Sequence, residues 1–105
     1  MKVVILASAE LDLKELRSTI VKNFSHDTWQ KTYGKLKESI RNLATFPHFG
    51  SIPEELETLN LSQYRQTLSG MNRIIYEVRQ DTVYIHIIVD SRRDLKSFLM
   101  HRLVR

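Results

Sequence analysis

The spacing of hydrophobic residues divides the chain into a helical first half and a strand-rich second half. Residues 3 to 6 are an unbroken, β-branched run that predicts a strand covered on both faces. The apolar residues that follow recur at near-helical spacing and predict a helix that Ser8 caps and that runs to about Asn23. Its expected buried face consists of Leu11, Leu16, Ile20 and Phe24.

A second helix is predicted after the capping residues Ser25 to Thr28, because apolar residues then follow at intervals of four and three. Its stripe consists of Trp29, Tyr33, Leu36, Ile40 and Leu43. Phe46-Pro47 ends this helix, because proline disfavours the helical conformation of the residue before it. Gly50 and Pro53 mark a loop, and residues 54 to 59 are expected to add one turn.

From Tyr64 onward the pattern alternates, which predicts three strands. The strands are expected at residues 64–68, 73–79 and 82–89, with turns at Ser69-Gly70 and Gln80-Asp81. In the last strand, one face is predicted to carry Val83, Ile85, Ile87 and Val89, and the other Tyr84, His86, Ile88 and Asp90. Ser91 to Asp94 match a capping box. It would open a final helix whose inward residues are Leu95, Phe98, Leu99 and Leu103.

These elements predict an α+β fold with the order strand, helical hairpin, three-stranded antiparallel meander and short C-terminal helix. A length of 105 residues fits one domain over residues 1–105. The sequence has no cysteine, which excludes disulfides and fits a reducing cytoplasm. The apolar start is too short for a signal peptide or a membrane span. The four histidines lack metal-ligand spacing, so no metal or other cofactor is expected.

Charge distinguishes the two halves. Residues 1–62 carry eight basic and eight acidic side chains, whereas residues 63–105 carry eight basic and four acidic ones, so the whole net charge of +4 lies in the last part. Because most of these bases are arginines, which pair in two-pronged fashion with carboxylate or phosphate, an acidic peptide or a nucleic acid is the expected partner. The same charges would equally suit a solvated rim that keeps a small domain soluble.

Several residues of this basic part are candidates for a site. Sheet geometry could bring together the arginines that we take as target-binding: Arg65, Arg73, Arg92, Arg93 and Arg102. Tyr64, Tyr76 and Tyr84 could stack a base or lend a hydroxyl, although aromatic residues are also ordinary strand residues. His48, His86 and His101 could transfer protons near neutral pH. We expect Asp94 to serve as a helix cap rather than as a catalytic acid.

The chain resembles the RelE/ParE superfamily of bacterial toxins from type II toxin-antitoxin modules. The likeness spans nearly the whole length and is carried by the element order, the Pro47 and Gly50 loop, and two motifs. Residues 73–78, Arg-Ile-Ile-Tyr-Glu-Val, are similar to the family's Y-R-I-x-Y-x-V strand, with Asn72 in place of the first tyrosine. Residues 89–95 and then Arg102-Leu103 resemble the ParE-like ending H-x-R-R-D-L followed by R-L, with Asp90 in place of the histidine.

The two branches of this family imply different activities. RelE-like members cleave mRNA on the ribosome without a metal, and the resemblance would then make Arg65, Arg73, Tyr76 and Arg92 the catalytic residues, with a histidine moving protons. ParE-like members inhibit DNA gyrase, which requires a binding surface and no proton relay. The strand at residues 64–68 lacks the lysines of the RelE branch, and the last helix has Phe98 and no tyrosine. The Arg-Arg-Asp-Leu ending favours the ParE branch.

The resemblance therefore implies a plasmid-stabilisation type of toxin that binds gyrase and is not itself an enzyme. A ribosome-dependent mRNA endonuclease acting on ribosome and mRNA is the alternative, and an inactive relative that only binds the antitoxin is a third. In each case the expected partner is a small acidic antitoxin whose amphipathic segment covers apolar and basic surface. Operator DNA would be bound only through the antitoxin complex, and no membrane is involved.

Overall fold

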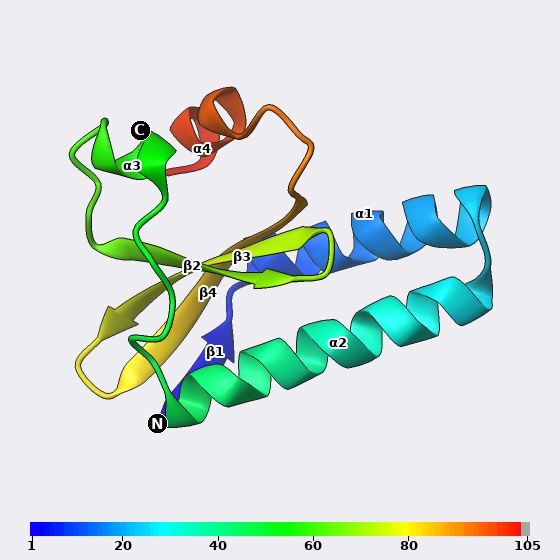
Figure 1. Cartoon of the computed structure of the whole chain (residues 1–105), viewed down its shortest axis with the longest axis horizontal. Helices are drawn as coiled ribbons and strands as arrows, with labels where there is room; N and C mark the ends of the chain where they lie inside the picture. Colours follow the sequence, from blue (N-terminus) through cyan, green and yellow to red (C-terminus); the bar gives the residue numbers. More distant parts are fainter. Residues whose placement is uncertain (104–105) are drawn as a thin grey trace.

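The computed structural model describes residues 1–103, with four helices and four strands (Figure 1). In chain order these are β1 (Lys2–Ile5), α1 (Ala7–Asn23), α2 (His26–Thr45), α3 (Glu54–Glu57), β2 (Tyr64–Ser69), β3 (Asn72–Arg79), β4 (Thr82–Asp90) and α4 (Leu95–Leu103). The predicted α+β class and element order are confirmed. Arg105, which we counted among the basic residues, lies outside the described residues, as do the side chains of Leu95 and Leu103.

The strands form one mixed sheet with the order β1-β4-β3-β2. The meander β2-β3-β4 is antiparallel, and β1 pairs in parallel with the first half of β4, from Lys2 opposite Thr82 to Ile5 opposite Ile85. Because β1 is short, β4 continues past it with an edge that no strand covers. That uncovered stretch of β4 lies next to the first turns of α1, where Ser8 and Asp12 contact it.

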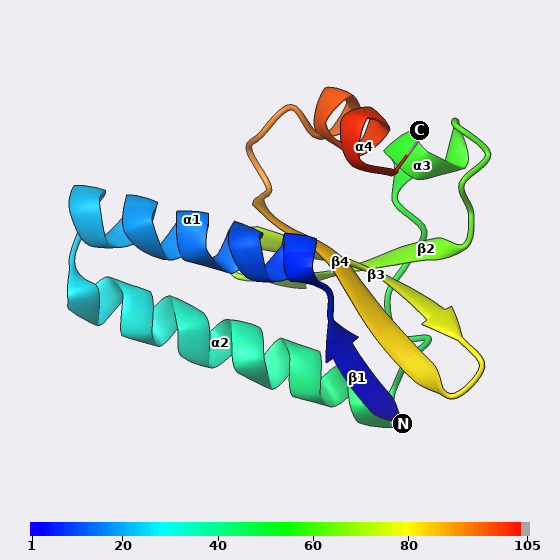
Figure 2. The same ribbon diagram turned by 180° about the vertical axis from the view of Figure 1, so that it is seen from behind.

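Helices cover both faces of the sheet. The α1–α2 hairpin packs on one face around Leu36, Leu43, Tyr76 and Ile85 (Figures 1 and 2). On the other face, Leu56 of α3 and Leu99 of α4 pack against Ile75 and Ile87. Each face thus has its own apolar cluster, which explains why the strands carry more apolar residues than a sheet with one face in water.

The second helix follows its predicted stripe except at Tyr33, which is 38% exposed, and the first helix departs from its stripe at two positions. Ser25 caps α2, since its hydroxyl accepts from the Thr28 N–H at 3.0 Å. In α1, Leu11 and Phe24 are 58% and 71% exposed, so their prediction as core residues is wrong. The buried face of α1 instead includes Ala9 and Asp12, because the helix is rotated to place a carboxylate against β4.

The predicted alternation in β4 is broken by a bulge. Ile75 lies opposite Ile87 while the next residue, Tyr76, lies opposite Ile85, so His86 is an extra residue in β4. The insertion moves the residues after it to the opposite faces. Val83 and Ile85 therefore pack beneath the helical hairpin, but Ile87 and Val89 pack beneath α3 and α4. The prediction that all four share one face is wrong for this reason.

Three predicted boundaries also shift. Ser8 does not cap α1, because the helix starts at Ala7 and the Ser8 hydroxyl donates to the His86 carbonyl at 3.3 Å. The first hairpin turn is Gly70-Met71, with Ser69 paired to Asn72. The C-terminal helix starts at Leu95 rather than after Ser91, whose N–H donates to the Met71 carbonyl at 2.7 Å.

Among the helices of the described residues 1–103, none combines the length and the apolar composition that a membrane span requires.

Candidate functional site

Two of the predicted target-binding arginines are held inside the fold. Arg73 on β3 pairs with both oxygens of Glu55 at 2.9 and 3.2 Å and donates to Gln66 at 2.7 Å, and its side chain is only 12% exposed. This guanidinium also lowers the pKa of the Glu55 carboxyl. Arg65 on β2 donates to the Gly50 carbonyl at 2.8 Å. Both residues fasten the loop between α2 and β2 to the sheet.

Arg102 of α4 is likewise bound internally. Its guanidinium spans the Asp12 carboxylate at 3.0 and 3.3 Å and donates to the His86 carbonyl at 2.9 Å. The side chains of Asp12 and Arg102 are 9% and 21% exposed. Like Arg65 and Arg73, Arg102 has its donors directed to atoms of this chain.

Arg92 and Arg93 differ from these three because they lie on the surface after the end of β4. Arg92 pairs with both oxygens of Asp90 at 3.0 and 2.7 Å, yet its side chain is 72% exposed. This contact lowers the pKa of the Asp90 carboxyl. The Arg93 guanidinium lies over the Phe98 ring at 4.5 Å, and the residue is exposed. The five arginines therefore do not converge through shared contacts, and only this pair is presented to solvent.

The residues that the resemblance assigned to ribonuclease chemistry lie in different places. Tyr76 is fully buried, and its hydroxyl accepts from the Gly50 N–H at 2.9 Å. Burial raises the pKa of this phenol, and that disfavours its use as a base. Arg65 reaches the same glycine through its carbonyl, whereas Arg73 and Arg92 are held by separate carboxylates. No proton-transfer site arises from these four residues as they stand.

Among the three candidate histidines, His86 is the one whose imidazole has a polar partner within the described residues. Its Nε2 lies 3.1 Å from Glu77 Oε1, and Tyr64 meets the imidazole edge-on with 5.1 Å between ring centroids. Burial lowers the pKa of His86, and the hydrogen bond to Glu77 partly opposes that effect. Burial also raises the pKa of Tyr64. His48 and His101 are exposed, and the His48 carbonyl accepts from Arg65 at 3.4 Å.

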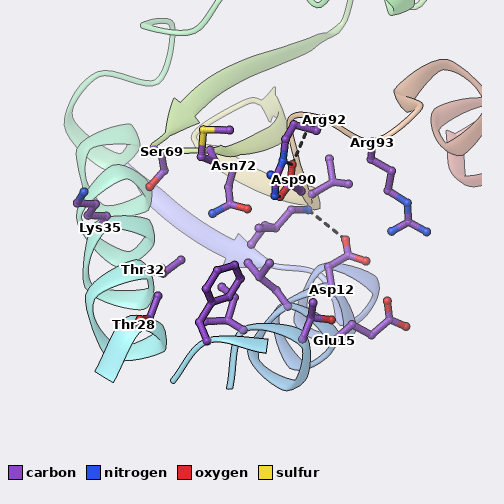
Figure 3. Close-up of a pocket in the computed structure, with 18 residues that line it drawn as sticks. Asp12, Glu15, Thr28, Thr32, Lys35, Ser69, Asn72, Asp90, Arg92 and Arg93 are labelled. Atoms are coloured by element: carbon purple, nitrogen blue, oxygen red, sulfur yellow. Dashed lines mark hydrogen bonds and ion pairs between the residues drawn. The ribbon is translucent and has the colours of Figure 1, made fainter. Parts of the chain in front are cut away.

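A cavity of about 570 Å³ lies between the helical hairpin, the β2–β3 turn and the end of β4 (Figure 3). Lys35 and Thr32 of α2 line one side, and Glu15 and Asp12 of α1 line another. Its apolar part is formed by Leu16, Ile20, Phe24, Met71 and Ile88. Arg92 and Arg93 stand at its rim, so the two exposed arginines that follow β4 border this cavity.

Hydrogen-bonding groups without partners face this cavity. The Ser69 hydroxyl oxygen is buried and has no hydrogen-bond partner among the described residues, and Asn72, also buried, points its amide into the same space (Figure 3). Buried polar groups are nearly always paired in native proteins. The unpaired Ser69 hydroxyl therefore leaves one hydrogen-bonding position open in the cavity wall, for water or for a bound group.

The uncovered edge of β4 forms part of the same wall. Because the Ser91 N–H bonds to Met71, the register turns the N–H and C=O groups of Ile88 and Asp90 away from β3. Asp12 accepts from the Ile88 N–H at 3.0 Å. Within residues 1–103, nothing pairs with the Ile88 carbonyl or the Asp90 N–H. The cavity thus offers backbone hydrogen bonds beside an apolar recess.

Sequence reasoning missed Asp12, Ser69 and Asn72. The sequence shows Asp12 only as one of the acidic residues of the first half, Ser69 as a turn residue, and Asn72 as the residue in place of the family's tyrosine. One signal was present: Asp12 stands between Leu11 and Leu13, one turn after the start of the helix. The partner of this aspartate, 90 positions later, has no signature in the sequence.

Comparisons with known proteins agree with this architecture. The family model described as "ParE toxin of type II toxin-antitoxin system, parDE" matches residues 3–95. One chain of the solved structure described as "Chromosomal ParDE TA system from P. aeruginosa" superposes with a TM-score of 0.71 at 15% identity. The match covers 86% of this chain and 95% of that chain. At this identity the second likeness concerns the fold alone. No curated protein matches the sequence.

Proposed function

This chain belongs to the ParE toxin family of type II toxin-antitoxin systems, and on that basis we propose that it inhibits DNA gyrase through the Arg92–Arg93 surface. The observation that carries this proposal is the exposure of these two arginines beyond β4, while Arg65, Arg73 and Arg102 bond within the chain. Two solvent-exposed guanidinium groups suit a carboxylate-rich protein surface or a phosphate backbone. Inhibition by binding needs no further chemistry.

The mRNA endonuclease remains the alternative, and the geometry favours it less. Cleavage by a ribose 2'-hydroxyl needs a base, an acid and cations aimed at one phosphate. Tyr76 is buried under Gly50, and the assigned arginines are held by different carboxylates. Within the described residues, the His86–Glu77 hydrogen bond is a pair that could transfer a proton. The hydrogen bonds of Arg65, Arg73 and Arg92 go to other groups. Primer extension on translated mRNA would support this alternative if it showed codon-positioned cuts.

A supercoiling assay tests the gyrase proposal. We expect the wild-type protein to inhibit purified gyrase, and the double variant Arg92→Glu/Arg93→Glu to need at least about a tenfold higher concentration, because charge reversal turns attraction into repulsion. The matched control is Lys14→Glu/Arg17→Glu, the same change in charge on the exposed face of α1. Unimpaired gyrase at saturating wild-type protein would contradict the proposal, and so would equal losses in both variants.

Membership of this family implies an antitoxin partner, and we propose that the cavity beside α1 receives its neutralising segment. An extended backbone would pair with the Ile88 carbonyl and the Asp90 N–H, as in strand addition to a sheet edge. An apolar side chain would fill the recess by Phe24 and Met71, which are 71% and 56% exposed. Lys35 and Arg93 at the rim favour an acidic segment.

Binding of the antitoxin encoded by the neighbouring gene tests this location. We expect Phe24→Ser/Met71→Ser to raise the dissociation constant at least about tenfold, because two apolar contacts are lost from the recess. The control is Phe46→Ser/Phe49→Ser, since these phenylalanines are 63% and 77% exposed but lie outside the cavity lining. Titration calorimetry would measure both. Unchanged affinity of the first variant would rule out this site.

A further inference from the structure

Beyond the end of β1, side chains take the place of a neighbouring strand on β4. The last parallel pair is Ile5 with Ile85, and the outward groups of β4 after it are the His86 carbonyl and the Ile88 N–H. The Arg102 guanidinium and the Ser8 hydroxyl donate to the His86 carbonyl, at 2.9 and 3.3 Å. Asp12 accepts from the Ile88 N–H. Together Asp12 and Arg102 supply the acceptor and the donor that a peptide unit of a further strand would offer.

Both carboxylate oxygens of Asp12 accept hydrogen bonds from these two neighbours. Oδ1 accepts from Arg102 Nη1 at 3.0 Å, while Oδ2 accepts from Arg102 Nη2 at 3.3 Å and from the Ile88 N–H at 3.0 Å. With 9% of its side chain exposed, this carboxylate depends on the guanidinium for charge compensation. No neutral side chain of the same shape offers acceptors on both atoms.

Through this pair, α1 holds the C-terminal helix. Arg102 lies in the last turn of α4, and one turn earlier the Phe98 ring contacts two guanidinium groups, with Arg102 at 5.2 Å and Arg93 at 4.5 Å from its centroid. Leu99 supplies the buried apolar contact of the helix. The position of Arg93 is therefore connected to Asp12 through Phe98 and Arg102.

We infer that Asp12 is a positioning residue of the toxin: its ion pair with Arg102 locks α4 against the free edge of β4 and so fixes the Arg92–Arg93 surface for its target. The inference rests on the proposed gyrase function for its last step only. The lock itself is a property of α1, β4 and α4. Released from Asp12, α4 would keep Leu99 as its main attachment, and Phe98 would lose a fixed Arg102 beside its ring.

Hydrogen exchange measured on the full chain tests the lock without reference to activity. We expect Asp12→Asn to speed exchange of the α4 backbone amides, residues 95–103, at least about tenfold, because the amide nitrogen of asparagine faces the guanidinium donors. Arg102→Gln should give the same result, and Arg102→Lys, which keeps the charge but not the two-pronged geometry, an intermediate one. The control is Glu15→Gln, one turn further along α1 and outside the ion pair.

The same variants then separate the lock from the proposed target. Asp12→Asn should weaken gyrase inhibition at least about tenfold while the exchange rates of α2 and β3 amides stay at wild-type values. If wild-type protein leaves gyrase unaffected, the proposed function fails and the exchange result still decides the lock. If α4 exchanges at the wild-type rate in Arg102→Gln, the inference is overturned. Should Asp12→Asn not fold, Arg102→Gln and Arg102→Lys provide the same comparison, because Arg102 lies in the last helix.

Discussion

Replacing Gly50 with alanine is expected to lower the free energy of unfolding by about 2–4 kcal/mol, because the new methyl group overlaps the backbone and breaks a buried hydrogen bond. A Cβ built on Gly50 lies 2.2 Å from the Gln66 carbonyl oxygen and 2.6 Å from the Tyr76 hydroxyl. Gly50 also donates its N–H to that hydroxyl and accepts from Arg65. The close approach of the loop to the sheet is therefore possible only without a side chain.

Gly34 provides the matched control for this substitution. It lies in α2 with open space around it, since nothing comes within 4 Å of a Cβ built there. Gly34→Ala should raise the free energy of unfolding by about 0.5–1 kcal/mol, because alanine is the better helix former. Urea unfolding of both variants measures the difference. A Gly50→Ala protein as stable as the wild type would show that the loop does not lie against the sheet as described.

Removing the Arg73 side chain is the second large effect that we expect. Arg73→Ala should lower the free energy of unfolding by about 2–4 kcal/mol, since it leaves the Glu55 carboxylate without its bidentate partner. The Arg73 and Glu55 side chains are 12% and 28% exposed, so water compensates this loss only in part. The loop that carries α3 would lose its main polar attachment to β3.

Arg92→Ala is the control for this effect, because Arg92 forms a pair of the same geometry with Asp90 on the surface. With 72% of the Arg92 side chain exposed, water takes over the contact, and no measurable change in stability is expected. Equal losses in the two variants would contradict the division of arginines into structural and surface ones.

The Glu55–Arg73 pair also has a characteristic pH dependence. Arg73 lowers the folded-state pKa of Glu55 below the ordinary value of 4.5. In the unfolded chain Glu55 has its ordinary pKa of about 4.5, so the stability that this pair contributes is fully present above that pH. It is lost as the pH falls through the lower folded-state pKa. The free energies of unfolding of the wild type and of Arg73→Ala should therefore converge as the pH falls from about 4.5 through the folded-state pKa of Glu55.

The sequence determined the elements, their order and their family. Helix α2 follows its stripe and its Ser25 cap, because periodicity and capping depend on residues within one or two turns. The strands β2, β3 and β4 appear within one or two residues of their predicted bounds for the same reason. The excess of arginine after residue 62 can be read directly from the sequence. It does not tell which of these arginines are buried in ion pairs and which are exposed to solvent.

Only the tertiary structure shows what each arginine contacts. Arg65, Arg73 and Arg102 are candidates for target binding by sequence, and their partners Gly50, Glu55 and Asp12 lie 15, 18 and 90 positions away. The bulge at His86 also had no local signal, although it assigns Ile87 and Val89 to the face under α3 and α4. Local patterns record which residues prefer a helix, a strand or a buried face. The pairing of a charge, and the side of a sheet after a bulge, depend instead on segments that meet only when the chain folds.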